Sequence, residues 1–271
     1  MTQELTQNQS EWIERLARLG YATKGAVYAI VGLLAIPAAF GGGGRTTDTE
    51  GALHTIVQQP FGKFLLSLVA IGLIGYALWR FVEAIKDPEN KGNDTKGILQ
   101  RIGYGISGII YTSLALSAVK IVLGSGSGNN SNSTQDWTAR ILAQPFGQWL
   151  VGTIGAFIIG MGFYQFYKAF TAKFRQKLNL VQLSDQEKKW VVGISRFGLF
   201  ARGIVFCLIG FFLIQAARQS DAGEAGGLGE ALQTLEQQPY GSWILAIVAL
   251  GLVAYGVYMV LQARYRRISA T

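Results

Sequence analysis

Long apolar stretches alternate with short polar stretches along the whole chain. A bilayer core about 30 Å thick is crossed by roughly 20 apolar residues of α-helix, and several stretches reach that length. They are too long and too uniformly apolar to be strands of a membrane barrel, which alternate over roughly ten residues. The pattern predicts an all-α, polytopic membrane protein with six transmembrane helices, at residues 21–40, 64–85, 102–123, 149–170, 197–217 and 243–263.

The first, third and fifth spans open with the same kind of sequence. Each opening has an arginine, a glycine two places later and a second glycine further along, followed by an aromatic residue. The second, fourth and sixth spans open with glutamine, proline, an aromatic residue and glycine. Because two independent markers recur with nearly the same period, the sequence indicates an internal repeat. The repeat markers are Arg18, Arg101 and Arg196, then Gly25, Gly108 and Gly203, and Pro60, Pro145 and Pro239.

Each repeat contains two spans, so consecutive repeats enter the membrane in the same sense. Repeats of this kind are parallel and are related by an axis along the membrane normal. We therefore expect three helical hairpins in a pseudo-threefold bundle, with a linear row of hairpins as the alternative. The expected divisions are a cytoplasmic N-terminal segment at residues 1–14 and hairpin repeats at residues 15–90, 98–178 and 184–267.

Local signals predict how the helices begin and how they pack. Proline is tolerated in the first turn of a helix, so we expect the three repeated prolines to start the even-numbered spans. The stretch before each proline predicts a short amphipathic helix on the outer membrane surface. The small-residue pairs that begin at Gly25, Gly108 and Gly203 predict close helix interfaces. Ser184 and Glu187 have capping-box spacing and predict an amphipathic segment before the fifth span.

The charge distribution predicts the orientation of the chain. All but five of the 24 Lys and Arg residues fall on one side of the expected spans, which is the side that stays in the cytoplasm. Both termini are therefore expected to be cytoplasmic. The net charge of +8 does not indicate nucleic-acid binding, because the basic residues lie between apolar segments and form no continuous face. The five residues on the other side are Arg45, Lys63, Lys120, Arg140 and Arg218.

The sequence offers little for catalysis. It has one histidine, His54, and one cysteine, Cys207, so it cannot supply a Cys/His metal site or a disulfide of its own. No Asp or Glu falls in the middle of a span, which removes the usual proton relay. Glu83 lies at the end of an even-numbered span and is expected to pair with a nearby basic residue. We expect no metal, no cofactor and no enzymatic activity.

The strongest candidate site is basic. Arg18, Arg101 and Arg196 occupy matching repeat positions, and Lys24 and Arg202 match each other a turn and a half deeper. In a pseudo-threefold bundle these residues would form a ring near the inner headgroups. One interpretation is a set of topology determinants that reach lipid phosphate, and the other is a vestibule that binds an anion or a lipid headgroup. The aromatic residues that could line such a vestibule are Tyr21, Tyr28, Tyr104 and Tyr111.

The repeat markers also resemble those of a known family. Three tandem pairs of transmembrane helices, opened by Arg-x-Gly-Tyr and by Gln-Pro-aromatic-Gly, resemble the domain of unknown function 1206 family of bacterial membrane proteins. The resemblance covers residues 15–267, and its third repeat departs with Leu199 in the place of tyrosine and Tyr240 in the place of phenylalanine. It implies the fold and a location in the bacterial inner membrane. It transfers no catalytic residues, because the family has no established activity.

Three kinds of function stay open at this point. The sequence favours a non-enzymatic accessory, scaffold or stress-related membrane component, because the spans are rich in packing glycines and carry no acidic residue at their centres. The second is a channel or transporter for a small neutral or anionic solute. The third is a lipid-binding or lipid-organising protein. Expected partners are membrane lipids with anionic headgroups on the cytoplasmic side, and a protein partner or a second copy of the chain, but not nucleic acid.

Overall fold

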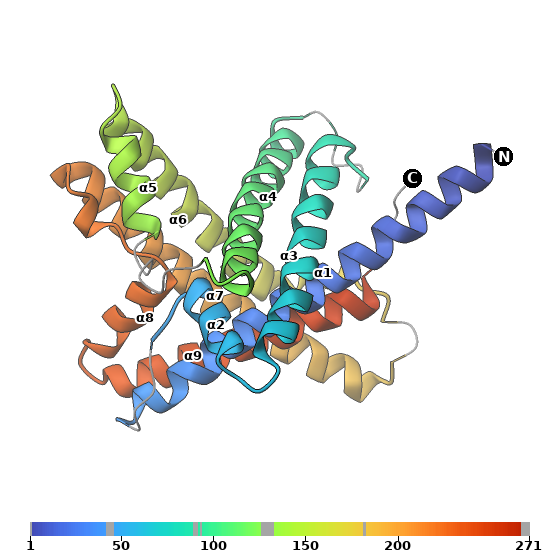
Figure 1. Ribbon diagram of the computed structural model, residues 1–271. Helices are drawn as coiled ribbons and strands as arrows, with labels where there is room; N and C mark the ends of the chain where they lie inside the picture. Colours follow the sequence, from blue (N-terminus) through green and yellow to red (C-terminus); the bar gives the residue numbers. More distant parts are fainter. Residues whose placement is uncertain are drawn as a thin grey trace.

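The computed structural model describes residues 2–41, 46–88, 92, 94–125, 133–180 and 183–266, with side chains described in these ranges except at 2–13, 96, 133 and 177. This part of the chain is helical (Figure 1) and, apart from an isolated bridge between Leu178 and Arg266, forms no strand. The long helices are α1 (Thr2–Ala39), α3 (Gly62–Ile85), α4 (Thr95–Val122), α6 (Gly147–Thr171), α7 (Asp185–Gln219) and α9 (Gly241–Tyr265). The short ones are α2 (Thr49–Val57), α5 (Ser133–Leu142) and α8 (Leu228–Glu236), with 3-10 turns η1 (Lys173–Lys177) and η2 (Ala222–Glu224).

All six long helices are long and apolar enough to cross a membrane, which confirms the six expected spans. The first of them begins at Thr2, so the expected N-terminal segment continues into the first span as one helix. Large apolar side chains point away from the bundle, and Phe64 and Ile109 are each 65% exposed. An outside of this kind is solvated by lipid tails. The chain is therefore a multi-pass membrane protein made of three repeated helical hairpins.

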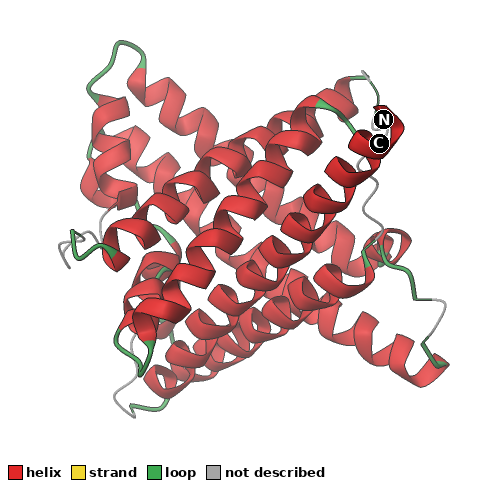
Figure 2. Ribbon diagram, turned by 45° about the vertical axis from the view of Figure 1, so that its right-hand side comes forward, coloured by secondary structure: helices red, strands yellow, loops and turns green. Residues whose placement is uncertain are grey.

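The long helices associate in three close pairs, α1 with α9, α3 with α4, and α6 with α7, and they cross one another in Figures 1 and 2. Each pair joins the first helix of one repeat to the second helix of the preceding repeat, with the first repeat following the third. Glycine allows this approach, since a Cβ added to Gly25 would lie 2.6 Å from the carbonyl oxygen of Gly256. Gly108 and Gly203 lie similarly close to α3 and α6, so all three glycines sit in helix interfaces.

Helices of the same repeat also pack together, but only in two of the three repeats. Helix α1 packs on α3 and α7 packs on α9, whereas α4 and α6, both fully described, are not packed against each other. Figure 1 shows α4 and α6 running apart toward the top of the view. The order of neighbours is thus α4, α3, α1, α9, α7 and α6. The pairs follow the expected pseudo-threefold relation, and the ring they would form is open between α4 and α6.

The turn that precedes each even-numbered span differs from the expectation. The prolines do not lie in the first helical turn, because the helices begin two residues later, at Gly62, Gly147 and Gly241. The aromatic residue between them has a left-handed backbone, with φ of 59° at Phe61, and this conformation cannot continue into a helix. The equivalent aromatic residues have φ of 62° and 60° and, like Phe61, are more than 80% exposed. Such exposed aromatic residues are typical of a membrane interface.

The three short helices form where the sequence predicts them, but two of them face the protein. Leu53 and Ile56 of α2 are buried against α1, α3 and α4, and Leu232 and Leu235 of α8 are buried against α7 and α9. Their apolar faces therefore contact the bundle and not a lipid surface, since the ends of the long helices offer them apolar partners. Helix α5 also packs on α6 and η2, but its Trp137 is 59% exposed.

A basic core lined by tyrosines

A buried carboxylate holds two arginines together at one end of the bundle. The Glu83 side chain is fully buried, and its two oxygens accept hydrogen bonds of 2.6 Å from Arg80 and from Arg266. Arg80 lies on the same helix, α3, while Arg266 follows the end of α9. The Tyr76 hydroxyl accepts from Arg80 and the Tyr21 hydroxyl accepts from Arg266. The expected pairing of Glu83 is present, and this one carboxylate pairs with both arginines.

Lys24 of α1 lies next to this cluster and is only 3% exposed. Its ammonium donates a 2.9 Å hydrogen bond to the Tyr76 hydroxyl. The same ammonium lies 4.6 Å from the centre of the Tyr76 ring and 4.6 Å from the centre of the Tyr111 ring. Aromatic faces attract cations, so the rings offset part of the cost of burying this charge. No carboxylate in the described part of the chain lies within ion-pair distance of Lys24.

Arg202 of α7 occupies the same repeat position as Lys24 and has the same kind of surroundings. Its guanidinium lies 4.3 Å from the ring centre of Phe206, 4.7 Å from that of Tyr255 and 5.7 Å from that of Tyr28. The Nε atom is buried and has no hydrogen-bond partner. Among the described residues no carboxylate pairs with Arg202 either.

Hydrogen-bond donors without acceptors therefore meet in the core. The hydroxyls of Tyr28, Tyr111 and Tyr255 make no hydrogen bond within the described residues. The rings of Tyr28 and Tyr255 lie against the Arg202 guanidinium, and the ring of Tyr111 lies against the Lys24 ammonium. These side chains come from α1, α4 and α9. Lys24 and Arg202 occupy the same position in the first and third repeats. Buried polar groups in proteins are nearly always paired. Around Lys24 and Arg202, which have no carboxylate partner, these hydroxyls have no acceptor within the described residues.

The three arginines of the predicted ring, Arg18, Arg101 and Arg196, lie apart from this core, at helix ends. Each lies at the end of a helix of the preceding repeat, α9, α3 or α6, and donates to its last carbonyl groups. Arg18 donates to Ala263 and Arg264, Arg101 to Ala84 and Ile85, and Arg196 to Phe170. A cation there satisfies carbonyls that the helix leaves unpaired and complements the helix dipole. The structure thus separates the five basic residues into three helix caps and a deeper pair.

The caps predict a graded loss of stability. We expect Arg18→Gln to cost the most, about 1–2 kcal/mol, because Arg18 makes two backbone bonds of 2.6 and 2.9 Å and also pairs with Glu14. Arg101→Gln should cost less, and Arg196→Gln, which loses one exposed bond of 3.3 Å, least. Unfolding by dodecyl sulfate in mixed micelles measures the order. Equal losses for the three variants would contradict it.

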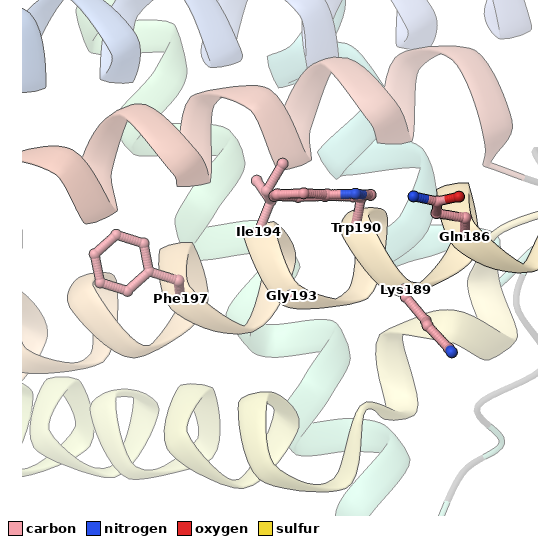
Figure 3. A pocket seen from close by; sticks show the side chains of 6 residues that line it. All are labelled: Gln186, Lys189, Trp190, Gly193, Ile194 and Phe197. Atoms are coloured by element: carbon pink, nitrogen blue, oxygen red, sulfur yellow. The ribbon is translucent and has the colours of Figure 1, made fainter.

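A concave surface lies along the start of α7. Gln186, Lys189, Trp190, Gly193, Ile194 and Phe197 line a hollow of about 660 Å³ on one face of this helix (Figure 3). The predicted capping box of Ser184 and Glu187 is present and begins the helix, which then runs without a break into the fifth span. All six lining residues belong to one helix, so the hollow is a shallow surface and lacks converging groups.

The candidate residues for metal or thiol chemistry are dispersed. Within the described ranges no three His, Cys, Asp or Glu side chains cluster closely enough to hold a metal ion. Cys207 lies in the α6–α7 interface, where a Cβ on Gly162 would come within 2.7 Å of its sulfur. Cys207 therefore occupies a packing position between two helices.

The fold and the core together define a class of protein, a six-helix membrane protein built from a triplicated hairpin around a basic, tyrosine-lined centre. The chain belongs to the family described as Domain of Unknown Function (DUF1206), whose model matches residues 19–87, 102–172 and 197–266. It is 41% identical over 266 residues to "Uncharacterized protein YxxB" of Bacillus subtilis (strain 168), covering 98% of this chain and 96% of that protein. No solved structure matches the chain.

The sequence had pointed to part of this core. Tyr21, Tyr28, Tyr104 and Tyr111 were expected to line a basic site, and all four lie against its cations. Two further tyrosines of the core were not expected from the sequence. They are Tyr76 of α3 and Tyr255 of α9, on the second long helices of the first and third repeats. The available signal was the repeat itself, because both tyrosines stand at the same distance after the marker proline.

Proposed function

We propose that this chain is a non-enzymatic membrane protein that binds an anionic group between Lys24 and Arg202. The observation that carries the proposal is the presence of two cations in the core without a carboxylate partner. Taking a charge out of water without a counter-ion costs several kcal/mol by rough estimate, and membrane proteins keep such groups where they serve a purpose. A bound anion would restore the charge balance.

The chemistry of the basic core favours a phosphate, sulfate or carboxylate group. Arginine presents a planar set of donors that fits two oxygens at once, and lysine adds a compact charge. The hydroxyls of Tyr28, Tyr111 and Tyr255, whose rings lie against the two cations, supply further donors. The surrounding aromatic rings exclude water, so hydrogen bonds to the anion gain strength. Nothing in this arrangement supplies a nucleophile next to a base.

The charge distribution also supports an orientation for this site. The start of α1 and the end of α9 lie together, since Arg18 binds the carbonyls of Ala263 and Arg264. Most Lys and Arg residues flank the helix ends on that side. We propose that this side faces the cytoplasm of a bacterial cell, with the protein in the inner membrane and the anion reached from the cytoplasmic half.

The test is anion binding by the purified protein in a non-ionic detergent. We expect inorganic phosphate and sulfate to raise the unfolding temperature, and Lys24→Met and Arg202→Met each to weaken binding at least about tenfold. Lys120→Met is the matched control, because this exposed lysine of α4 loses the same charge far along the helix from the core. It should leave binding unchanged.

A second readout separates a binding role from a structural one. If the two cations serve only the ligand, Lys24→Met and Arg202→Met should unfold at a higher temperature than the wild type when no anion is present. A loss of binding together with loss of stability in both variants would contradict the proposal. So would equal phosphate, sulfate and anionic-lipid binding by the wild type and the double variant. In that case an accessory or scaffold role would account better for the packing-rich helices.

A further inference from the structure

The two packed interfaces within repeats share a glycine contact that the second repeat lacks. A Cβ added to Gly20 of α1 would lie 2.6 Å from Tyr76 of α3, and one added to Gly198 of α7 would lie 2.4 Å from Tyr255 of α9. The matching residue of the second repeat is Gly103 of α4, and no atom lies within 4 Å of its Cβ position. We call the facing surfaces of α4 and α6 the open interface.

Bulky side chains at a second matching position keep this interface open. In the first repeat Gly72 faces Thr23, and in the third Gly251 faces Ala201, each with a Cβ position closer than 2.5 Å to the opposite side chain. In the second repeat the corresponding pair is Phe157 on α6 and Ile106 on α4. These two side chains cannot share the space that a glycine leaves elsewhere. The second repeat therefore cannot close in the way that the other two do.

The exposed fractions of equivalent residues show the same difference. Val27 of α1 is 1% exposed and Val205 of α7 is 2% exposed, whereas Ile110, their counterpart on α4, is 57% exposed. Ile106 is 39% exposed and its counterpart Thr23 is 7% exposed. The open interface is thus apolar, and in a bilayer an apolar surface of this kind is filled by alkyl chains.

Both helices of the open interface also carry buried polar residues. On the α4 side, the ring of Tyr111 stands 4.6 Å from the Lys24 ammonium. On the α6 side, Gln165 is 7% exposed and its Oε1 atom is buried without a hydrogen-bond partner, while Lys168 adds positive potential at Lys24. Polar groups from both walls therefore lead to the cations, and apolar groups of the same walls face the bilayer.

We propose that the anion bound by this core is the head of an anionic amphiphile whose alkyl chain lies in the open interface between α4 and α6. The inference rests on the proposed function, because it needs the site at Lys24 and Arg202. It adds the class of ligand, a carboxylate or phosphate group joined to an alkyl chain. Lys24 stands six residues after Arg18, so at 1.5 Å per residue the head lies about 9 Å deeper than the cap arginines. Entry is sideways from the bilayer.

The test compares ligands with and without an alkyl chain. The protein in non-ionic detergent is titrated with myristate, with phosphatidylglycerol and with inorganic phosphate. We expect at least one of the two amphiphiles to bind at least tenfold more tightly than phosphate, and Lys24→Met to weaken it. Preference for myristate would identify a free fatty-acid head, and preference for phosphatidylglycerol a phospholipid head.

Variants of the open interface show where the chain lies. Gly103→Leu and Gly160→Leu place a side chain where no atom lies within 4 Å of the added Cβ, so the fold tolerates them. Both should weaken amphiphile binding about tenfold and leave phosphate binding unchanged. Gly193→Leu is the matched control, since Gly193 on α7 is equally open but lies away from this interface, and it should change neither.

Two results would overturn the inference, and they differ in what else they affect. If phosphate binds at Lys24 and Arg202 but the amphiphiles bind no more tightly, the ligand class is wrong and the proposed function stands. If the amphiphiles bind but Gly103→Leu and Gly160→Leu match the Gly193→Leu control, the chain does not lie between α4 and α6. Absence of binding by every probe would instead remove the proposed function itself.

Discussion

Replacing Glu83 by glutamine is expected to destabilise the protein by about 3–5 kcal/mol, the effect seen when one partner of a buried ion pair is removed. The Glu83 carboxylate is fully buried and is the shared partner of Arg80 and Arg266. Without it two more cations would stand in a core that already holds Lys24 and Arg202. Glutamine keeps the shape of the side chain, so the loss measures charge and not packing.

Dodecyl sulfate titration in mixed micelles measures this free energy of unfolding. Glu14→Gln is the matched control, because Glu14 pairs with Arg18 at the surface, where both side chains are more than 30% exposed. A surface pair of this kind contributes roughly 0–1 kcal/mol. We expect the double variant Glu83→Gln/Arg266→Gln to recover part of the loss, because one of the unpaired cations is removed with the carboxylate. A cost for Glu83→Gln no larger than that of Glu14→Gln would contradict the buried-pair account.

Replacing Gly256 by valine is expected to prevent α1 and α9 from packing, at a cost of about 3 kcal/mol or more. A Cβ at this position would lie 2.6 Å from the carbonyl oxygen of Gly25, and backbone atoms cannot move aside as the end of a flexible side chain can. The α1–α9 pair joins the first repeat to the third, so its loss separates the two ends of the fold.

Size-exclusion chromatography of detergent extracts, followed by thermal unfolding, measures this effect. We expect Gly256→Val to give aggregated or poorly recovered protein. The same substitution at Gly193, which has open space around its Cβ position, should elute as the wild type does. Similar profiles for Gly256→Val and Gly193→Val would show that the α1–α9 contact is looser than its backbone spacing indicates.

The sequence was sufficient for the fold because its signals are physical and repeated. Span length predicts the six long helices, and the arginine, glycine and proline markers predict three hairpins. The glycines at 25, 108 and 203 were assigned to helix interfaces, where they lie, because close backbone approach in lipid requires a residue without a side chain.

The basic site was only partly predictable. Sequence position places Lys24 a turn and a half beyond Arg18, but it does not say which helix stands opposite either residue. That information comes from two kinds of helix contact. Packing on the preceding repeat directs Arg18 to the end of α9, and packing within the repeat directs Lys24 to Tyr76 of α3. The position of the proline before each even-numbered helix was also misjudged, because a left-handed aromatic residue is rare enough that no composition rule anticipates it.

The open interface between α4 and α6 could in principle be predicted from the sequence. Ile106 and Phe157 stand where the other repeats carry small residues, so the alignment of the three repeats already distinguishes the second from its neighbours. Its meaning depends on knowing that those positions face each other, which only the packed first and third repeats reveal.

The partnership of α1 with α9 has a consequence for biogenesis. Among the described helices, α1 is synthesised before the others and α9 after them, so the glycine face of α1 stays without this close partner until α9 has been made. Chains that stop before residue 241 would lack α9 and therefore the contact between α1 and α9. An unfinished copy therefore leaves the glycine face of α1 exposed to lipid.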